Sequence, residues 1–172
     1  MSGLDSIPVS QVMASPVKTI QENEILQQAC KVMTQNNIGS VIVVVAHSVN
    51  AQAPAGIITE RDIVRHIAER PVSFSGPVNQ LMSKPVVTLH PNASLQDALQ
   101  TMQARRIRRL LVVSDDGNNV AGILTDRDIF RFVARNASVS SGLVTDQVFA
   151  KNRDMAERFK TSLLDDIWRR RP

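Results

Sequence analysis

The octapeptide GIITERDI at residues 56–63 recurs as GILTDRDI at residues 122–129. Two earlier segments recur in the same order along the chain. They are MASPVKT at 13–19, matched by MSKPVVT at 82–88, and LQQA at 26–29, matched by LQDA at 95–98. Several matched segments in register indicate one supersecondary unit that is present twice.

The offset between the two copies changes along the chain. It is 69 residues at the first matched segment (82 minus 13) and 66 residues at the octapeptide (122 minus 56). The difference falls between residues 47–55 of the first copy and residues 115–121 of the second, where an Asp-Gly pair indicates a tight turn. Because loops tolerate changes of length better than strands, we expect a longer loop in the first copy.

Bulk composition favours one compact unit. The chain has 172 residues, of which 43% are hydrophobic, enough for one ordinary core or two small fused ones. Its longest apolar run, residues 41–46, is far shorter than the roughly 20 residues of a membrane span, and the N-terminus has no signal-like pattern. We expect a cytoplasmic protein without membrane contact.

Few residues in the sequence indicate catalytic or metal chemistry. Cys30 is the only cysteine and aligns with Leu99, which predicts a small buried side chain rather than a reactive thiol. The three histidines have no ligand-like spacing, and no nucleophile or phosphate-loop motif is present. We therefore predict no catalytic residues, no metal site and no required cofactor.

The repeated pattern predicts a β-α-β-β-α unit in each copy. Leu26, Ala29, Cys30 and Met33 have the i, i+3, i+4, i+7 spacing of one helix face, and Ser94 with Asp97 indicates a capped helix start in the second copy. The remaining predicted elements are strands at 17–20, 41–45, 55–58, 110–113 and 120–124, a hairpin at 115–119, and closing helices at 61–68 and 127–134.

The chain divides into four segments at this level. We predict repeat 1 at residues 7–70, a linker at 71–77 that contains Pro, Ser and Gly, and repeat 2 at 78–136. Residues 143–172 have no counterpart in either repeat. Their apolar side chains recur every four residues, which predicts a helical appendage for dimerisation or docking.

The pattern Gly-h-h-Thr-x-x-Asp, with h apolar, occurs at residues 56–62 and 122–128, and Met-x-x-Pro-Val-x-Thr opens each copy. These motifs resemble those of the cystathionine-β-synthase (CBS) domain pair over residues 7–136. The resemblance implies an α/β (α+β) fold of two repeats packed as a pseudo-twofold pair, with two clefts between them. It also implies a non-enzymatic regulatory module, a homodimer, and AMP, ADP, ATP or S-adenosylmethionine as ligand, among which the sequence does not choose.

The motif itself suits such a ligand. Glycine permits close backbone approach, and the Thr and Asp fall at a helix N-terminus, whose partial positive charge favours phosphate. A carboxylate can accept hydrogen bonds from both ribose hydroxyls, so Asp62 and Asp128 are the ribose candidates. The simpler interpretation is that Thr and Asp only cap the helix.

The resemblance also assigns residues to the two clefts. One combines Thr59 and Asp62 with Val86, Val87, Arg108 and Arg109; the other combines Thr125 and Asp128 with Val17, Lys18, Gly39 and Ser40. Because the two arginines belong to the first set, we expect tighter phosphate binding in the cleft that contains Asp62.

Two alternatives remain open. The chain could be a docking adaptor whose clefts stay empty and whose C-terminal segment holds an unidentified protein. It could also bind nucleic acid through the arginines at 105–109 and 169–171, since its formal charge is +4. Only 3% of residues are aromatic and none is tyrosine, so few side chains could stack on bases. Nucleic-acid binding is therefore the weaker alternative.

Overall fold

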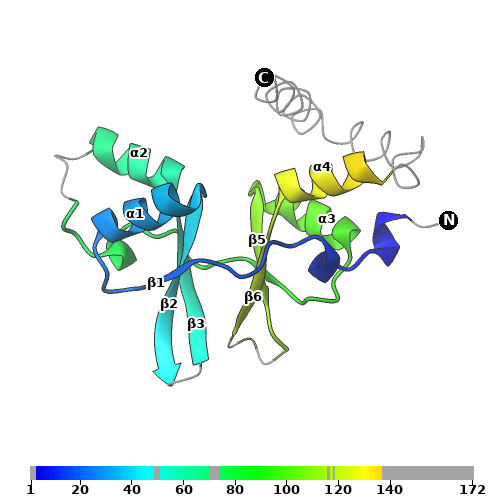
Figure 1. Ribbon diagram of the computed structural model, residues 1–172, viewed down its shortest axis with the longest axis horizontal. Helices are drawn as coiled ribbons and strands as arrows, with labels where there is room; N and C mark the ends of the chain where they lie inside the picture. Colours follow the sequence, from blue (N-terminus) through cyan, green and yellow to red (C-terminus); the bar gives the residue numbers. More distant parts are fainter. Residues whose placement is uncertain (1–2, 49–50, 70–73, 116, 118, 137–172) are drawn as a thin grey trace. The chain divides into compact units, whose positions relative to one another are not determined.

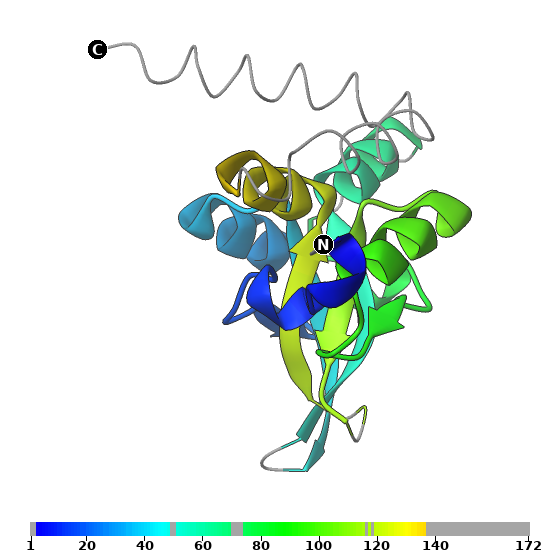
Figure 2. The same cartoon turned by 90° about the vertical axis from the view of Figure 1, so that its right-hand side faces the viewer.

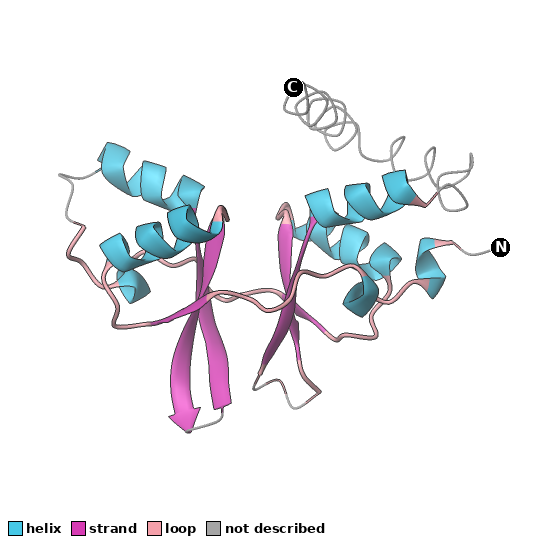
Figure 3. Ribbon diagram, viewed as in Figure 1, coloured by secondary structure: helices cyan, strands magenta, loops and turns pink. Residues whose placement is uncertain are grey.

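The computed structural model describes residues 3–48, 51–69, 74–115, 117 and 119–136. Each repeat runs strand, helix, strand, strand, helix (Figure 3), as the sequence predicts. Repeat 1 contains β1 (Thr19–Gln21), α1 (Leu26–Asn36), β2 (Ser40–Ser48), β3 (Ala51–Thr59) and α2 (Glu60–Glu69). Repeat 2 contains β4 (Thr88–Leu89), α3 (Leu95–Arg105), β5 (Arg109–Val113), β6 (Val120–Thr125) and α4 (Asp126–Arg135). The predicted appendage at 143–172 lies outside the described residues.

Each repeat forms one three-stranded sheet with its second strand in the centre. The orders are β1-β2-β3 and β4-β5-β6. The first strand of each sheet runs parallel to the central one, and β2 pairs with β3 in antiparallel register, with Val43 opposite Gly56. Short helical crossovers between the first two strands account for the parallel pairing.

The longer first copy is not explained by a longer loop. β2 extends to Ser48 and β3 begins at Ala51, so most of residues 47–55 lie in strands. Register shifts between Val43 and Val44 and between Ala46 and Ser48 accommodate extra residues in the paired strands. The prediction of a loop insertion is therefore wrong, because the additional residues continue the backbone hydrogen bonding of the hairpin.

The chain folds into two compact units whose boundaries differ from those of the sequence repeats. The larger unit contains residues 14–91 and 110–123; the smaller contains, of the described residues, 3–13, 92–109 and 124–136. Strands β5 and β6 run from one unit into the other. The repeat is thus a unit of sequence, while the compact bodies combine parts of both repeats.

The larger unit buries both faces of β2. Side chains on a strand alternate between its faces, and Val41, Ile42, Val43 and Val44 all have 0% exposure. Val41 and Val43 pack with α1, which together with α2 covers one face of this sheet (Figure 1). Ile42 and Val44 pack with Leu111 of β5 on the opposite face. The strand is therefore buried on both sides, as its uninterrupted apolar run predicts.

The segment that opens each repeat pairs with the last strand of the other repeat. In the larger unit, the amide of Ser83 donates to the carbonyl of Ile57 at 2.9 Å and the reverse bond measures 3.1 Å. Ala14 and Ile123 exchange the equivalent two bonds at 2.8 and 3.0 Å. These exchanged segments make each repeat depend on the other for its backbone hydrogen bonds.

In the smaller unit, the N-terminal segment lies beside α3. The 3₁₀ helix Leu4–Ser6 contacts α3, as Figure 2 shows, and the amide of Leu95 donates to the carbonyl of Ile7 at 2.9 Å. Ser94 and Asp97 form the predicted capping box at the start of α3. Arg106 ends the helix in a left-handed conformation with φ 55°.

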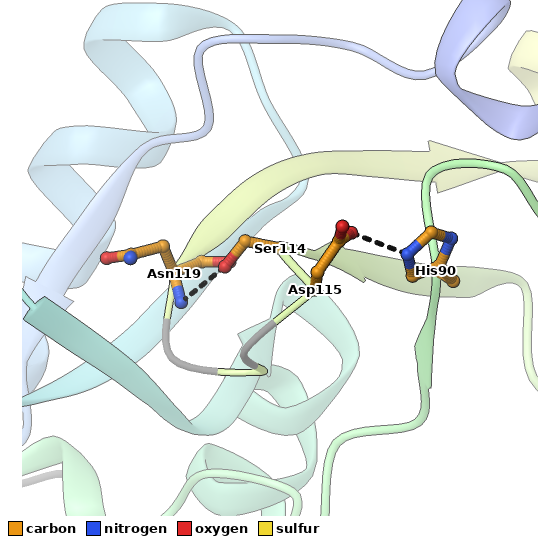
Figure 4. A network of polar contacts seen from close by, with 4 residues as sticks. All are labelled: His90, Ser114, Asp115 and Asn119. Carbon is orange, nitrogen blue, oxygen red and sulfur yellow. Dashed lines mark hydrogen bonds and ion pairs between the residues drawn. The ribbon is translucent and has the colours of Figure 1, made fainter.

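A polar network holds the turn between β5 and β6 (Figure 4). The amide of Asn119 donates to Oγ of Ser114 at 3.1 Å, and Gly117 takes a φ of 69°. Asp115 contacts Nε2 of His90, in the loop after β4, at 2.5 Å. The Asp-Gly signal in the sequence thus corresponds to an observed hairpin turn.

Gly56 is a close-packing position on β3. A Cβ atom there would lie 2.6 Å from Cγ and 2.9 Å from Cβ of Met82. The motif glycine is therefore required here because the Met82 side chain occupies the space that any larger residue would need.

We predict that Gly56→Ala lowers the free energy of unfolding by about 1–3 kcal/mol, because the added methyl overpacks the contact with Met82. The check is urea unfolding followed by circular dichroism. Gly76→Ala is the matched control, since a Cβ there meets nothing within 4 Å. Equal destabilisation by the two substitutions would refute the close-packing explanation.

Candidate functional site

The first motif joins the end of β3 to the start of α2 through reciprocal hydrogen bonds. The amide and hydroxyl of Thr59 both donate to Oδ2 of Asp62, at 2.9 and 2.6 Å. The amide of Asp62 donates in return to Oγ1 of Thr59 at 3.3 Å. This arrangement is a capping box, which satisfies amides that a helix start leaves without partners.

The second motif repeats this geometry between β6 and α4. The amide and hydroxyl of Thr125 donate to Oδ2 of Asp128 at 3.0 and 2.6 Å. The amide of Asp128 donates to Oγ1 of Thr125 at 3.2 Å. In both motifs the box uses one carboxylate oxygen, so capping and ligand binding are compatible roles for the same aspartate.

The carboxylates differ at their second oxygen. Oδ1 of Asp62 accepts a hydrogen bond from the hydroxyl of Ser83 at 3.2 Å. Within the described part of the chain, no hydrogen bond is seen to Oδ1 of Asp128. Sequence reasoning missed Ser83, although the alignment of Met82-Ser83 with Met13-Ala14 displays the difference. Ser83 reaches Asp62 because its backbone pairs with Ile57, and no local sequence pattern indicates this pairing.

Each central strand begins beside the helix of its own repeat. The amide of Glu60 donates to the carbonyl of Gly39 at 3.2 Å, and Ser40 pairs with Thr59 in the sheet. The amide of Asp126 donates to the carbonyl of Arg108 at 3.1 Å, one residue before β5 begins at Arg109. The structure therefore brings Gly39 and Ser40 to the first motif and Arg108 to the second.

The other candidates from the sequence lie mainly in the packing of the larger unit. Val17 and Val86 pack against the cluster that contains Ile42 and Leu111. The carbonyls of Lys18 and Val87 accept hydrogen bonds from the amides of Ile42 and Leu111, at 3.2 and 3.1 Å. Val17 and Val86 thus have a core role whether or not a ligand also contacts them.

The titratable groups outside the motifs include one cysteine with a shifted pKa. Burial raises the pKa of the Cys30 thiol, which packs against the core cluster of repeat 1. Among the described residues, no group of three or more His, Cys, Asp or Glu side chains could hold a metal ion. None of the helices in that part of the chain has both the length and the apolar character needed to cross a bilayer.

We predict that Thr125→Ala destabilises the protein by about 1 kcal/mol, because the start of α4 loses its capping hydroxyl. Thr125→Ser, which retains the hydroxyl, should keep most of the stability. The measurement is the urea midpoint of both variants beside the unsubstituted protein. If Thr125→Ser were as unstable as Thr125→Ala, the capping bond would not be the cause.

Comparisons with known proteins identify the family of the chain. A sequence model of the CBS domain matches residues 9–69 and again residues 78–135. The CBS domain-containing protein YhcV from Bacillus subtilis is 34% identical over 135 residues, which cover 78% of this chain and 91% of YhcV.

Solved structures show the same architecture. One is the CBS domain pair of protein MJ0100 in complex with 5′-methylthioadenosine and S-adenosyl-L-methionine, with a TM-score of 0.65 and 26% identity over 74% of this chain and 96% of that one. Another is the CBS domain protein PAE2072 from Pyrobaculum aerophilum complexed with AMP, with a TM-score of 0.65 over 76% of this chain and 100% of that one. Its identity of 22% supports the fold alone. Two family matches in register and two three-stranded sheets with duplicated Thr-x-x-Asp caps show that this chain belongs to the CBS domain family, as a CBS domain pair.

Proposed function

We propose that this protein is a regulatory module without catalytic activity that binds an adenosyl ligand at its Thr-x-x-Asp motifs. The observation that carries the proposal is the duplicated cap, in which an aspartate is anchored through Oδ2 at the N-terminus of a helix. The related domain pair that holds 5′-methylthioadenosine and S-adenosylmethionine supports this ligand class.

The contacts favour the second motif for a ligand that carries phosphate. Arg108 is exposed, and its carbonyl accepts a hydrogen bond from the amide of Asp126, the first residue of α4. The N-terminus of this helix carries partial positive charge. The corresponding position beside the first motif is Gly39, which has no charge to offer. This assignment reverses the expectation from the sequence, because Arg108 lies next to the motif of its own repeat.

A bound ligand can regulate only if its binding changes the packing elsewhere in the molecule. Ile42 and Val44 of repeat 1 pack with Leu111 of repeat 2 in one buried cluster of the larger unit. Close-packed side chains transmit small displacements, so a shift of either central strand alters the packing of the other. A ligand changes this packing only as far as its affinities for the two arrangements differ, typically by about 1–3 kcal/mol.

We predict saturable binding of AMP, ATP or S-adenosylmethionine in calorimetric titrations. Arg108→Ala should weaken AMP and ATP about tenfold, because one charge-assisted hydrogen bond to phosphate is lost. 5′-Methylthioadenosine, titrated beside them, has neither a phosphate nor a carboxylate, so its affinity should not change. Arg105→Ala is the matched control, since this arginine is also exposed and ends α3, and no hydrogen bond joins it to a motif among the described residues.

The same titrations separate the alternatives. Absence of heat with all three ligands, in folded protein freed of carried-over nucleotide, would contradict the proposal and favour the docking adaptor. Nucleic-acid binding would instead appear as affinity for duplex DNA that falls steeply with salt, by nearly one log unit per neutralised phosphate for each log unit of salt.

We also propose that the protein forms a homodimer through α2. Among the described side chains of this helix none is buried, and Val64 and Ile67 are 66% and 40% exposed. Their counterparts on α4, Phe130 and Val133, are 7% and 9% exposed. Neighbouring exposed apolar side chains are typical of an interaction surface, and a second copy of α2 would cover them symmetrically.

We predict that Val64→Glu shifts sedimentation velocity profiles from dimer to monomer, because a carboxylate at the interface centre must lose its hydration. Arg65→Glu adds a carboxylate at the adjacent exposed position, beside the apolar residues, and should leave the dimer intact. A Val64→Glu protein that still sediments as a dimer would place the interface elsewhere.

A further inference from the structure

We propose that Ser83 makes the two motifs unequal, so that a ribose binds at Asp128 before it binds at Asp62. The hydroxyl of Ser83 occupies an acceptor position on Asp62 that a ribose diol would need. The inference rests on the proposed function, and it identifies which motif an adenosyl ligand fills first and which residue sets that order.

The two carboxylates differ in their number of free acceptor positions. An ionised carboxylate offers about four lone-pair positions, two on each oxygen. Asp62 accepts two bonds from Thr59 at Oδ2 and one from Ser83 at Oδ1, so three positions are used. Asp128 accepts two bonds from Thr125 at Oδ2, and no described group donates to its Oδ1. Asp128 can accept both hydroxyls of a ribose, whereas Asp62 can accept only one.

The position of Ser83 is set by the backbone. Its amide and carbonyl both bond to Ile57, which lies two residues before Thr59 on β3. The preceding Met82 occupies the space left by Gly56, and this contact holds the same segment against the strand. The serine hydroxyl therefore lies within 3.2 Å of Asp62 as a consequence of strand pairing.

The counterpart of Ser83 in repeat 1 cannot make such a bond. Ala14 pairs with Ile123 through two backbone bonds, as Ser83 pairs with Ile57. Its methyl side chain has no hydrogen-bond donor. Among the described groups, Asp62 thus has one acceptor position left and Asp128 has two.

The serine weakens the first site without closing it. Ser83 is exposed, so its hydroxyl can turn to water when a ribose approaches. The ligand must replace an existing hydrogen bond, which lowers its affinity by about threefold to tenfold. The serine affects only the hydrogen bonds between the ribose and Oδ1 of Asp62, since the capping bonds use Oδ2.

The test weakens the second motif with Asp128→Asn, so that the remaining binding reports on the first motif. It then compares the Asp128→Asn protein with the Asp128→Asn, Ser83→Ala double variant. Calorimetric titration uses AMP and S-adenosylmethionine, both of which carry a ribose diol. Ser83→Ala should raise affinity at Asp62 by about threefold to tenfold. For 2′-deoxy-AMP, which presents one hydroxyl, the gain should be absent, because a single acceptor position already suffices.

Two further variants complete the comparison. Ser83→Thr retains a hydroxyl and should not raise affinity, which separates the hydrogen bond from side-chain size. In the unsubstituted background, Asp128→Asn should weaken binding more than Asp62→Asn does.

The outcomes separate the two proposals. If the unsubstituted protein binds these ligands but Ser83→Ala leaves affinity at Asp62 unchanged, or if the two Asn variants lose affinity equally, the inference about Ser83 is overturned alone. If no protein of the series binds AMP or S-adenosylmethionine while circular dichroism shows a folded chain, the proposed function fails and the inference fails with it.

Discussion

The exchange of opening segments between the repeats is the constraint on which the described structure depends. Ser83 of repeat 2 bonds to Ile57 of repeat 1, and Ala14 of repeat 1 bonds to Ile123 of repeat 2. A strand edge without a partner would leave amides and carbonyls unsatisfied, so neither sheet is complete without the other repeat. The compact units consequently mix the two repeats, although the sequence motifs are contiguous.

The Thr-x-x-Asp motif caps a helix and leaves room for the proposed ligand, because a carboxylate has more acceptor positions than a cap requires. Thr59 and Thr125 each occupy one oxygen of the following aspartate. This bonding fixes the side chain at the helix N-terminus before any ligand arrives, which reduces the ordering cost of binding. In the proposed function, the groups that reach the second carboxylate oxygen decide how many hydrogen bonds a ligand can make there.

Duplication supplies two such positions, and small differences make them chemically distinct. Arg108 and Gly39 occupy matched places at the starts of the two central strands, and Ser83 and Ala14 occupy matched places in the opening segments. Both differences are the basis on which we propose the second motif for a ligand with ribose and phosphate. A pair of unequal sites can respond to ligand over a wider concentration range than two equal ones, since each saturates at its own affinity.

The repeat, the order of elements and the motif residues could all be predicted from local patterns in the sequence. Helical spacing around Leu26, the cap at Ser94 and the Asp-Gly turn are local signals, and each appears in the structure where it was predicted. Three features required the folded chain: the extra residues of repeat 1 lengthen a hairpin, Arg108 lies beside Asp126, and Ser83 reaches Asp62. The reason is physical: periodicity and capping act within a few residues, whereas these three features depend on backbone pairing across sequence distances that no local pattern reports.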